Sequence, residues 1–433
     1  MIEERLAAQP TASIPEASED WAEAKAIYRF WDNSKVSAIG ILEGYQSQVQ
    51  ERIAQQKVVL SIQDTTDLSF VHHPSKTGAK GFGLLSGQDY LLGLKVHSTL
   101  AVSEHGVPLG ILDQEVWARP PEEKGKAKQR RQRSLKEKES VRWLRSQVAS
   151  ELGMAEGVTM ITVADAEADI YELMALERSE SVHLLIRANH NRRVEHPSQY
   201  LKAAIAEVPV AGTTTVEVSA KEGHPPRQAT LSVRYQSLPI LPPRNRPGSA
   251  QLSPLTIQVI WAHEEHPPQG VEPISWLLLT TLNVTSFEQA CQCLRWYALR
   301  WLIERFHYVL KSGCRIEQLQ LETAERIQRA LATYLIVAWR LLWLTYEARV
   351  NPEQSCEVAL EPFEWQALFC HVHRSTTPPT QPPSLAQAVL WIARLGGFLA
   401  RRHDGFPGVK TLWRGLRRLH DIAATWQLCH SNP

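Results

Sequence analysis

The stretch that decides the fold is Val58-Val59-Leu60-Ser61-Ile62-Gln63-Asp64. Its first six residues are mostly apolar and β-branched, which predicts a short buried strand that ends at Asp64. A second run of the same kind, Met160-Ile161-Thr162-Val163-Ala164, ends at Asp165. Carboxylates at the ends of neighbouring strands can converge outside the sheet, where Mg²⁺ and similar ions take oxygen ligands. The two runs therefore predict a sheet with an acidic site at one edge.

Further strands are predicted on both sides of these runs. Two strands at 91–102 and 108–118 follow the first run as a meander, and strands at 182–186 and 275–282 follow the second. Helical segments alternate with the later strands, which favours an α/β fold with a mixed sheet. Residues from about 197 to 275 contain alternating segments and several prolines, which predicts a β-rich insertion in this sheet.

The length and composition allow two or three globular regions. The chain has 433 residues, of which 43% are apolar and 21% charged, and a domain averages about 150 residues. This composition excludes a disordered, collagen-like or disulfide-stapled protein. We expect a helical N-terminal segment at 1–57, the sheet with its insertion at 58–320, and a helical C-terminal region at 321–433.

Charge and targeting patterns narrow the class of partner. The formal net charge is +1, so a polyanion would have to be held by local basic patches. One such patch has eleven Lys or Arg against four Glu between residues 119 and 145, and a second follows residue 394. The N-terminus lacks a secretory signal, no Cys-x-x-Cys pair occurs, and the most apolar helix, 330–348, contains Arg340. We therefore expect a cytoplasmic protein without a membrane segment.

A third acidic candidate lies on a predicted helix that Ser286 caps and that runs to Lys311. At roughly 100° per residue, Tyr297, Arg300, Glu304 and Lys311 share one narrow stripe of this helix. In a cleft, Glu304 would bind a metal ion, while Arg300 and Lys311 would hold phosphate oxygens. Taken singly, each feature also fits an ordinary role: a turn or cap for the aspartates, and a solvated helix face for the stripe.

Three blocks of the sequence resemble those of a known family. They are Asp64-Thr65-Thr66, then Asp165-x-Glu167-x-Asp169-Ile170-Tyr171, and finally Tyr297-x2-Arg300-x3-Glu304-x6-Lys311. They look like the signature blocks of bacterial DDE transposases of the insertion-sequence-four family, which includes the transposon-five-type enzymes. Further matches, such as Trp276-Leu277-Leu278-Leu279-Thr280, extend the resemblance over nearly the whole chain.

The resemblance implies a ribonuclease-H-like fold and a cut-and-paste DNA transposase. Asp64, Asp165 and Glu304 would hold Mg²⁺, which Mn²⁺ can replace, and each chemical step would be an in-line attack on a phosphodiester. Trp276 would receive a flipped terminal base. The resemblance further implies double-stranded DNA as the partner, a homodimer formed through the C-terminal helices, a place at the bacterial nucleoid, and DNA contacts by Tyr297, Arg300, Lys311, Arg187, Arg192 and Arg193.

The sequence also departs from the family, which leaves two alternatives. Ala166 and Tyr308 stand where relatives carry an arginine and a lysine, and the N-terminal DNA-binding segment looks shortened. A shortened chain could act as a non-catalytic inhibitor that pairs with a full-length copy. A domesticated metal-dependent nuclease would use the same three carboxylates without transposition.

Overall fold

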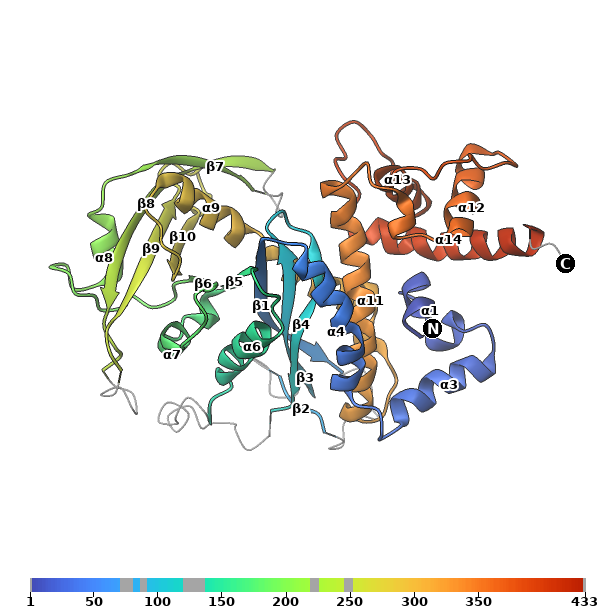
Figure 1. The fold of residues 1–433 in the computed structure, drawn as a ribbon, viewed down its shortest axis with the longest axis horizontal. Helices are drawn as coiled ribbons and strands as arrows, with labels where there is room; N and C mark the ends of the chain where they lie inside the picture. Colours follow the sequence, from blue (N-terminus) through green and yellow to red (C-terminus); the bar gives the residue numbers. More distant parts are fainter. Residues whose placement is uncertain are drawn as a thin grey trace.

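A mixed sheet forms the centre of the molecule (Figure 1). The computed structural model describes residues 2–70, 81–85, 92–119, 137–218, 226–244 and 252–430. The strand order is β2-β3-β1-β5-β6-β10-β9-β8-β7, and β4 also pairs with β3. β1, β5 and β6 are parallel, whereas the other pairs are antiparallel. The mixed α/β prediction is therefore confirmed. The strands are β1 (Val58–Ser69), β2 (Gly83–Leu84), β3 (Leu92–Ser103), β4 (Pro108–Trp117), β5 (Thr159–Ala164), β6 (Val182–Arg187), β7 (Gly212–Val218), β8 (Arg227–Ile240), β9 (Leu255–His263) and β10 (Ser275–Thr280).

β1 is longer than the sequence predicts. Its antiparallel pairing with β3 continues as far as Ser69↔Gly93, whereas its parallel pairing with β5 ends at Gln63↔Ala164. Asp64 therefore lies within β1 and not after it, so the predicted strand end is wrong. Asp64 does, however, mark the residue at which the parallel ladder stops.

The predicted β-rich insertion extends the central sheet. It contains α8 (Leu201–Ala206) and strands β7, β8 and β9, which join the sheet because β9 pairs with β10. Pro239 lies in β8 opposite Thr256 of β9. The pairing of β8 with β7 stops at Val233, so Pro239 occupies a part of β8 that β7 does not pair.

Helices cover both faces of the sheet and form the C-terminal region. α11 lies between the sheet and the C-terminal helices α12, α13 and α14 (Figure 1). One apolar core contains Trp31 of the N-terminal helices, Ile62 of β1 and Leu331 of α11, while a separate core joins the end of α11 to α12, α13 and α14. The helices are α1 (Ile2–Ala8), α2 (Ile14–Ala17), α3 (Trp21–Asp32), α4 (Ala38–Ala54), α6 (Val141–Leu152), α7 (Tyr171–Ala175), α9 (Phe287–Ala298), α10 (Trp301–Tyr308), α11 (Ala324–Val350), α12 (Pro362–His373), α13 (Leu385–Leu395) and α14 (Val409–His430).

The described helices of the protein differ from membrane-spanning helices. Within the described ranges, none combines the length and the apolar composition that a membrane crossing requires. The most apolar predicted segment, 330–348, lies within α11, where most of its side chains pack in the protein core.

Candidate active site

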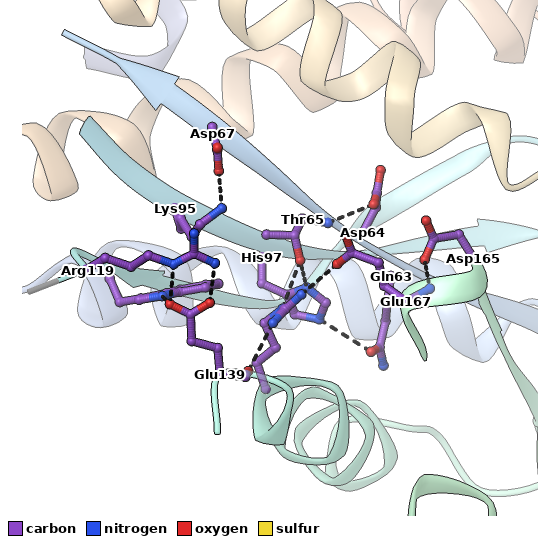
Figure 2. A network of polar contacts seen from close by, with 12 residues as sticks. Gln63, Asp64, Thr65, Asp67, Lys95, His97, Arg119, Glu139, Asp165 and Glu167 are labelled. Carbon is purple, nitrogen blue, oxygen red and sulfur yellow. Dashed lines mark hydrogen bonds and ion pairs between the residues drawn. The ribbon is translucent and has the colours of Figure 1, made fainter. Parts of the chain in front are cut away.

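Two predicted carboxylates meet where the parallel strands β1 and β5 separate. Gln63 and Ala164 form the last pair of that ladder, so the next residues of the two strands, Asp64 and Asp165, lie side by side (Figure 2). Asp165 caps the 3₁₀ turn Ala166–Ala168 and accepts a 2.9 Å hydrogen bond from the backbone N–H of Glu167. Asp64 accepts a 2.8 Å bond from the N–H of Thr65. The strand register thus brings both carboxylates to one point.

The charge on Asp64 is unfavourable in the protein alone. Burial, followed by the neighbouring carboxylate of Asp165, raises the pKa of Asp64 to about 7. Glu304 adds a smaller effect in the same direction, whereas the Thr65 N–H and the Arg300 guanidinium oppose it. Because three carboxylates repel one another here, a cation at this point would relieve the repulsion.

The third carboxylate lies on a helix that is interrupted. Ser286 caps α9 with a capping box, as predicted, but the helix does not run unbroken to Lys311. Hydrogen bonds of the i→i+3 type, from Arg300 N–H to Tyr297 C=O and from Leu302 N–H to Leu299 C=O, tighten the backbone before α10 begins. A π-helical turn, Val309–Gly313, then holds Lys311.

The predicted stripe is therefore not one regular helix face. Tyr297 lies in the last turn of α9, Arg300 at the junction, Glu304 in the first turn of α10 and Lys311 in the π turn. The prediction of one continuous helix is wrong. The three elements nevertheless bring Arg300 and Glu304 close enough to Asp64 for both to affect its pKa.

Arg300 forms an ion pair with Glu304, one helical turn away. The side chain of Glu304 remains 33% exposed, so it can exchange partners. In the described part of the chain, no three His, Cys, Asp or Glu side chains are close enough together to hold a metal ion. The donor set is all oxygen, which suits Mg²⁺ or Mn²⁺, but Glu304 would have to leave Arg300 to join Asp64 and Asp165.

Aromatic and basic side chains lie beside the carboxylates. Tyr297 is buried and packs edge-to-face on Trp276, with ring centroids 5.6 Å apart. Burial raises the pKa of Tyr297, so its hydroxyl stays protonated, although Arg300 and Arg187 lower that pKa in part. Arg187 is exposed at the end of β6 and donates a 3.3 Å hydrogen bond to the Ser275 C=O.

Two other predicted DNA contacts have structural partners. Arg192 donates from Nε to Asp169 Oδ1 at 2.8 Å, and the side chains of Arg192 and Asp169 are 8% and 0% exposed. Arg193 donates to the Pro242 C=O at 3.1 Å. The structure therefore does not bring Arg192 to the carboxylates but uses it to hold the turn after β5.

Several residues around the site had no local signal in the sequence. The guanidinium of Arg142 donates to Thr65 Oγ1 and to Glu167 Oε2, each at 2.9 Å, and its side chain is 9% exposed. Arg142 belongs to the basic patch at 119–145, of which residues 120–136 lie outside the described residues. Arg119 of the same patch forms an ion pair with Glu139 (Figure 2).

Two buried histidines support the strands that carry Asp64. His97 Nδ1 lies 2.9 Å from Thr65 Oγ1, and its Nε2 lies 3.4 Å from Gln63 Oε1 (Figure 2). On the other face of β1, His307 Nδ1 lies 3.9 Å from Asp64 Oδ2 and Nε2 lies 3.2 Å from Ser98 Oγ. Sequence spacing could not reveal these contacts because they join segments far apart in the chain.

Three family models match this chain. A model described as "Transposase DDE domain" matches residues 85–340, which is more than half of the chain. A model described as "Transposase DNA-binding" matches residues 1–36, and "Transposase Tn5 dimerisation domain" matches residues 336–428. The first match contains Asp165 and Glu304, while Asp64 lies before it on β1.

Proposed function

The chain belongs to the Tn5-type DDE transposases of the insertion-sequence-four family, and from this membership we propose that Asp64, Asp165 and Glu304 form its Mg²⁺-dependent catalytic site. The family is typically dependent on a divalent metal. Its members have a ribonuclease-H-like catalytic domain, a DNA-binding domain and a dimerisation domain, and they move DNA by cut and paste. The observation that carries the proposal is the meeting of Asp64 with Asp165 within the electrostatic reach of Glu304.

The three carboxylates would hold Mg²⁺, with Mn²⁺ in the same role, once Glu304 has exchanged Arg300 for the ion. Such ions activate the attacking oxygen and stabilise the charge that develops on the leaving oxygen. Arg300, freed from Glu304, would then bind a phosphate oxygen as a planar fork, and Lys311 would bind one as a point charge. Because Glu304 must leave Arg300 to join the ion, Arg300 would become free to bind phosphate only when the three carboxylates have come together.

The aromatic pair beside the carboxylates would bind an unstacked DNA base. We assign Trp276 as the stacking surface for that base and Tyr297 as the residue that orients the Trp276 ring. Arg187, exposed beside them, would bind the adjacent phosphate. A base held in this way would lie outside the duplex stack.

The same site would carry out each step of transposition in turn. Water cleaves one strand at each transposon end, and the freed 3′-OH attacks the opposite strand to form a hairpin. Water reopens the hairpin, and the 3′-OH then attacks target DNA. Each step forms one P–O bond and breaks another in an in-line displacement, so one set of positioned groups suffices.

We also propose how the regions divide this work. Residues 1–57 bind the transposon end, residues 58–320 carry the chemistry, and residues 321–433 pair two copies in a homodimer. An enzyme with these DNA substrates would act at the bacterial nucleoid in the cytoplasm.

The test is cleavage of DNA that carries the ends of the element encoding this chain, with Mg²⁺ and with EDTA. We expect cleavage by the natural chain in Mg²⁺ only, and none by Asp64→Asn, Asp165→Asn or Glu304→Ala. DNA binding in EDTA and the melting temperature serve as controls and should change little. Mg²⁺-dependent cleavage by Glu304→Ala would refute the assignment.

A further inference from the structure

A basic groove lies where the end of α10 meets α14. It has a volume of about 840 Å³. One wall comes from the last turn of α10 and the residues after it, including Tyr308, Ser312 and Arg315. The other wall is one face of α14. The groove contains five cationic side chains and one carboxylate, Asp421; the cations are Arg315, Lys410, Arg414, Arg417 and Arg418.

The cations of α14 share one face of the helix. Lys410, Arg414 and Arg418 follow one another at intervals of four residues, so their side chains lie along one row. All three are exposed. Like charges at this spacing destabilise a helix, and Lys410 in the first turn also opposes the helix dipole. The row therefore costs stability unless an anion binds to it.

Three of the five cations are available to a ligand. Arg417 is engaged by Glu16 of α2, and Arg418 donates a 2.8 Å hydrogen bond to the Leu395 C=O. Over the described ranges of the chain, the side chains of Arg315, Lys410 and Arg414 have neither a hydrogen-bond nor an ion-pair partner.

The groove is fixed to the active site by close packing. A Cβ on Gly313 would lie 2.8 Å from Cε3 of Trp413, so the π turn after α10 contacts the indole of α14 directly. The ring of Tyr308 also packs on Trp413, with centroids 5.7 Å apart. The basic row on α14 therefore has a defined position relative to Glu304, which lies on the same short helix as Tyr308.

We propose that this groove binds the phosphate backbone of duplex DNA through Arg315, Lys410 and Arg414. Arginine forks and lysine point charges are the usual partners of phosphate oxygens, and such contacts position a duplex without reading its bases. The bound segment would therefore lie outside the site of Asp64, Asp165 and Glu304. The inference depends on DNA as the substrate and not on the assignment of those carboxylates.

The test compares two triple variants in EDTA, so that binding is measured without cleavage. One removes the groove cations (Arg315→Gln, Lys410→Gln, Arg414→Gln), and the other removes three exposed cations that do not line the groove (Arg244→Gln, Arg295→Gln, Arg374→Gln). Fluorescence anisotropy then measures affinity over a salt series. The probes are a duplex from the end of the encoding element and an unrelated duplex of equal length.

We expect the groove variant to lose about ten-fold or more in affinity for both duplexes. The slope of log K against log salt should fall in magnitude by about 2 to 3, because each phosphate contact contributes about 0.9. The control variant should keep the natural slope. If the groove variant melts at a lower temperature, Lys410→Gln alone should still reduce the slope by about 0.9.

Four outcomes would overturn the proposal. The first two are an unchanged salt slope in the groove variant and an equal loss of DNA affinity in the control variant. The third is a loss of affinity by the groove variant for the end-derived duplex only. The fourth is a change in the dimer mass of the groove variant while each dimer binds DNA as before. The last outcome would assign the row to the subunit interface. Failure of the proposed catalytic site would appear separately, as cleavage by Glu304→Ala with all of these binding results intact.

Discussion

Side chains alternate between the two faces of β1, so the carboxylate of Asp64 and the residues that support its strand lie on opposite faces. Asp64 faces α10, where His307 lies 3.9 Å from its carboxylate. The next side chain, Thr65, faces the opposite side and binds Arg142 and His97. Arg142 in turn reaches Glu167, two residues after Asp165. One buried guanidinium thus links the two segments that carry the paired aspartates.

Replacing this guanidinium should loosen the site. We expect Arg142→Met to destabilise the protein by about 2 kcal/mol, because Thr65 and the Glu139 C=O lose a charged donor. The rate of cleavage should fall as well, since Asp64 and Asp165 lose their link. Urea unfolding measures the first effect. The neighbouring Arg145→Met, whose side chain is 60% exposed, should cost less than about 1 kcal/mol; equal costs for both variants would contradict the account.

The same buried layer predicts a sensitivity to acid. Burial, followed by the charges of Arg142 and His307, lowers the pKa of His97 to about 3. In the unfolded chain this pKa is near 6.5. Between these values the unfolded chain binds a proton that the native protein does not, so stability is complete above 6.5 and falls as the pH decreases.

We therefore expect His97→Gln to be less sensitive to acid than the natural chain. From pH 8 to pH 5 the free energy of unfolding should fall by about 2 kcal/mol less in the variant. The variant should still be the less stable protein at pH 8, because Thr65 and Gln63 lose their shared partner. Urea unfolding at both pH values measures the difference, and parallel acid losses in the two proteins would reject this role for His97.

In the C-terminal region, the helices α13 and α14 are in direct contact. α13 and α14 cross where Gly396 and Gly415 leave no room for a side chain. A Cβ on Gly415 would lie 1.8 Å from the Ile392 C=O, and a Cβ on Gly396 would lie 1.8 Å from the Thr411 C=O. The two backbones therefore touch, and neither can move away without losing the core that includes Ile392 and Leu412.

Gly415→Ala should separate these two helices. We expect a loss of at least about 2 kcal/mol, together with weaker dimerisation, because backbone atoms cannot yield as a flexible side chain would. Thermal unfolding and sedimentation measure these effects. Gly44→Ala in α4 is the matched control, since nothing lies within 4 Å of its added Cβ; it should be neutral or slightly stabilising. A neutral Gly415→Ala would contradict the direct backbone contact between α13 and α14.

Local pattern predicted most strands and the paired aspartates, but not the contacts that complete the site. Apolar, β-branched runs located β5 and β6 to within a residue or two. The extension of β1 beyond Asp64 depends on β3, and the break at Arg300 depends on i→i+3 hydrogen bonds that a 3.6-residue period does not contain. Within the predicted helical region at 321–433, Glu361 and Pro362 mark the start of α12. Arg192 was expected to contact DNA. Its ion pair with Asp169 could not be predicted from local pattern, because the two residues are 23 positions apart.

At the scale of the whole molecule, the predicted regions share one core. Trp31 of α3 donates a 3.2 Å hydrogen bond to Thr333 of α11, and Arg329 of α11 donates to the C=O groups of Trp31 and Val36. The N-terminal helices that match the DNA-binding model are therefore attached to the long helix behind the sheet. A bound transposon end would have a defined position relative to the proposed catalytic residues.

This shared core predicts that residues 58–320 do not fold alone. Without α4 and α11, one apolar face of the sheet would be exposed to water. Circular dichroism during heating should give no cooperative transition for the fragment, whereas the full chain should give one. A cooperative transition in the fragment would mean that the catalytic region is an independent domain.

The most direct test of the central claim follows each chemical step through a single site. Intact, pre-nicked, hairpin-ended and fully cleaved transposon ends are each given to the natural chain and to Glu304→Gln in Mg²⁺. We predict that the natural chain converts every substrate and that Glu304→Gln, still bound to DNA, converts none. If one step survived at its natural rate in Glu304→Gln, the site formed by Asp64, Asp165 and Glu304 would not be the one site for all four reactions.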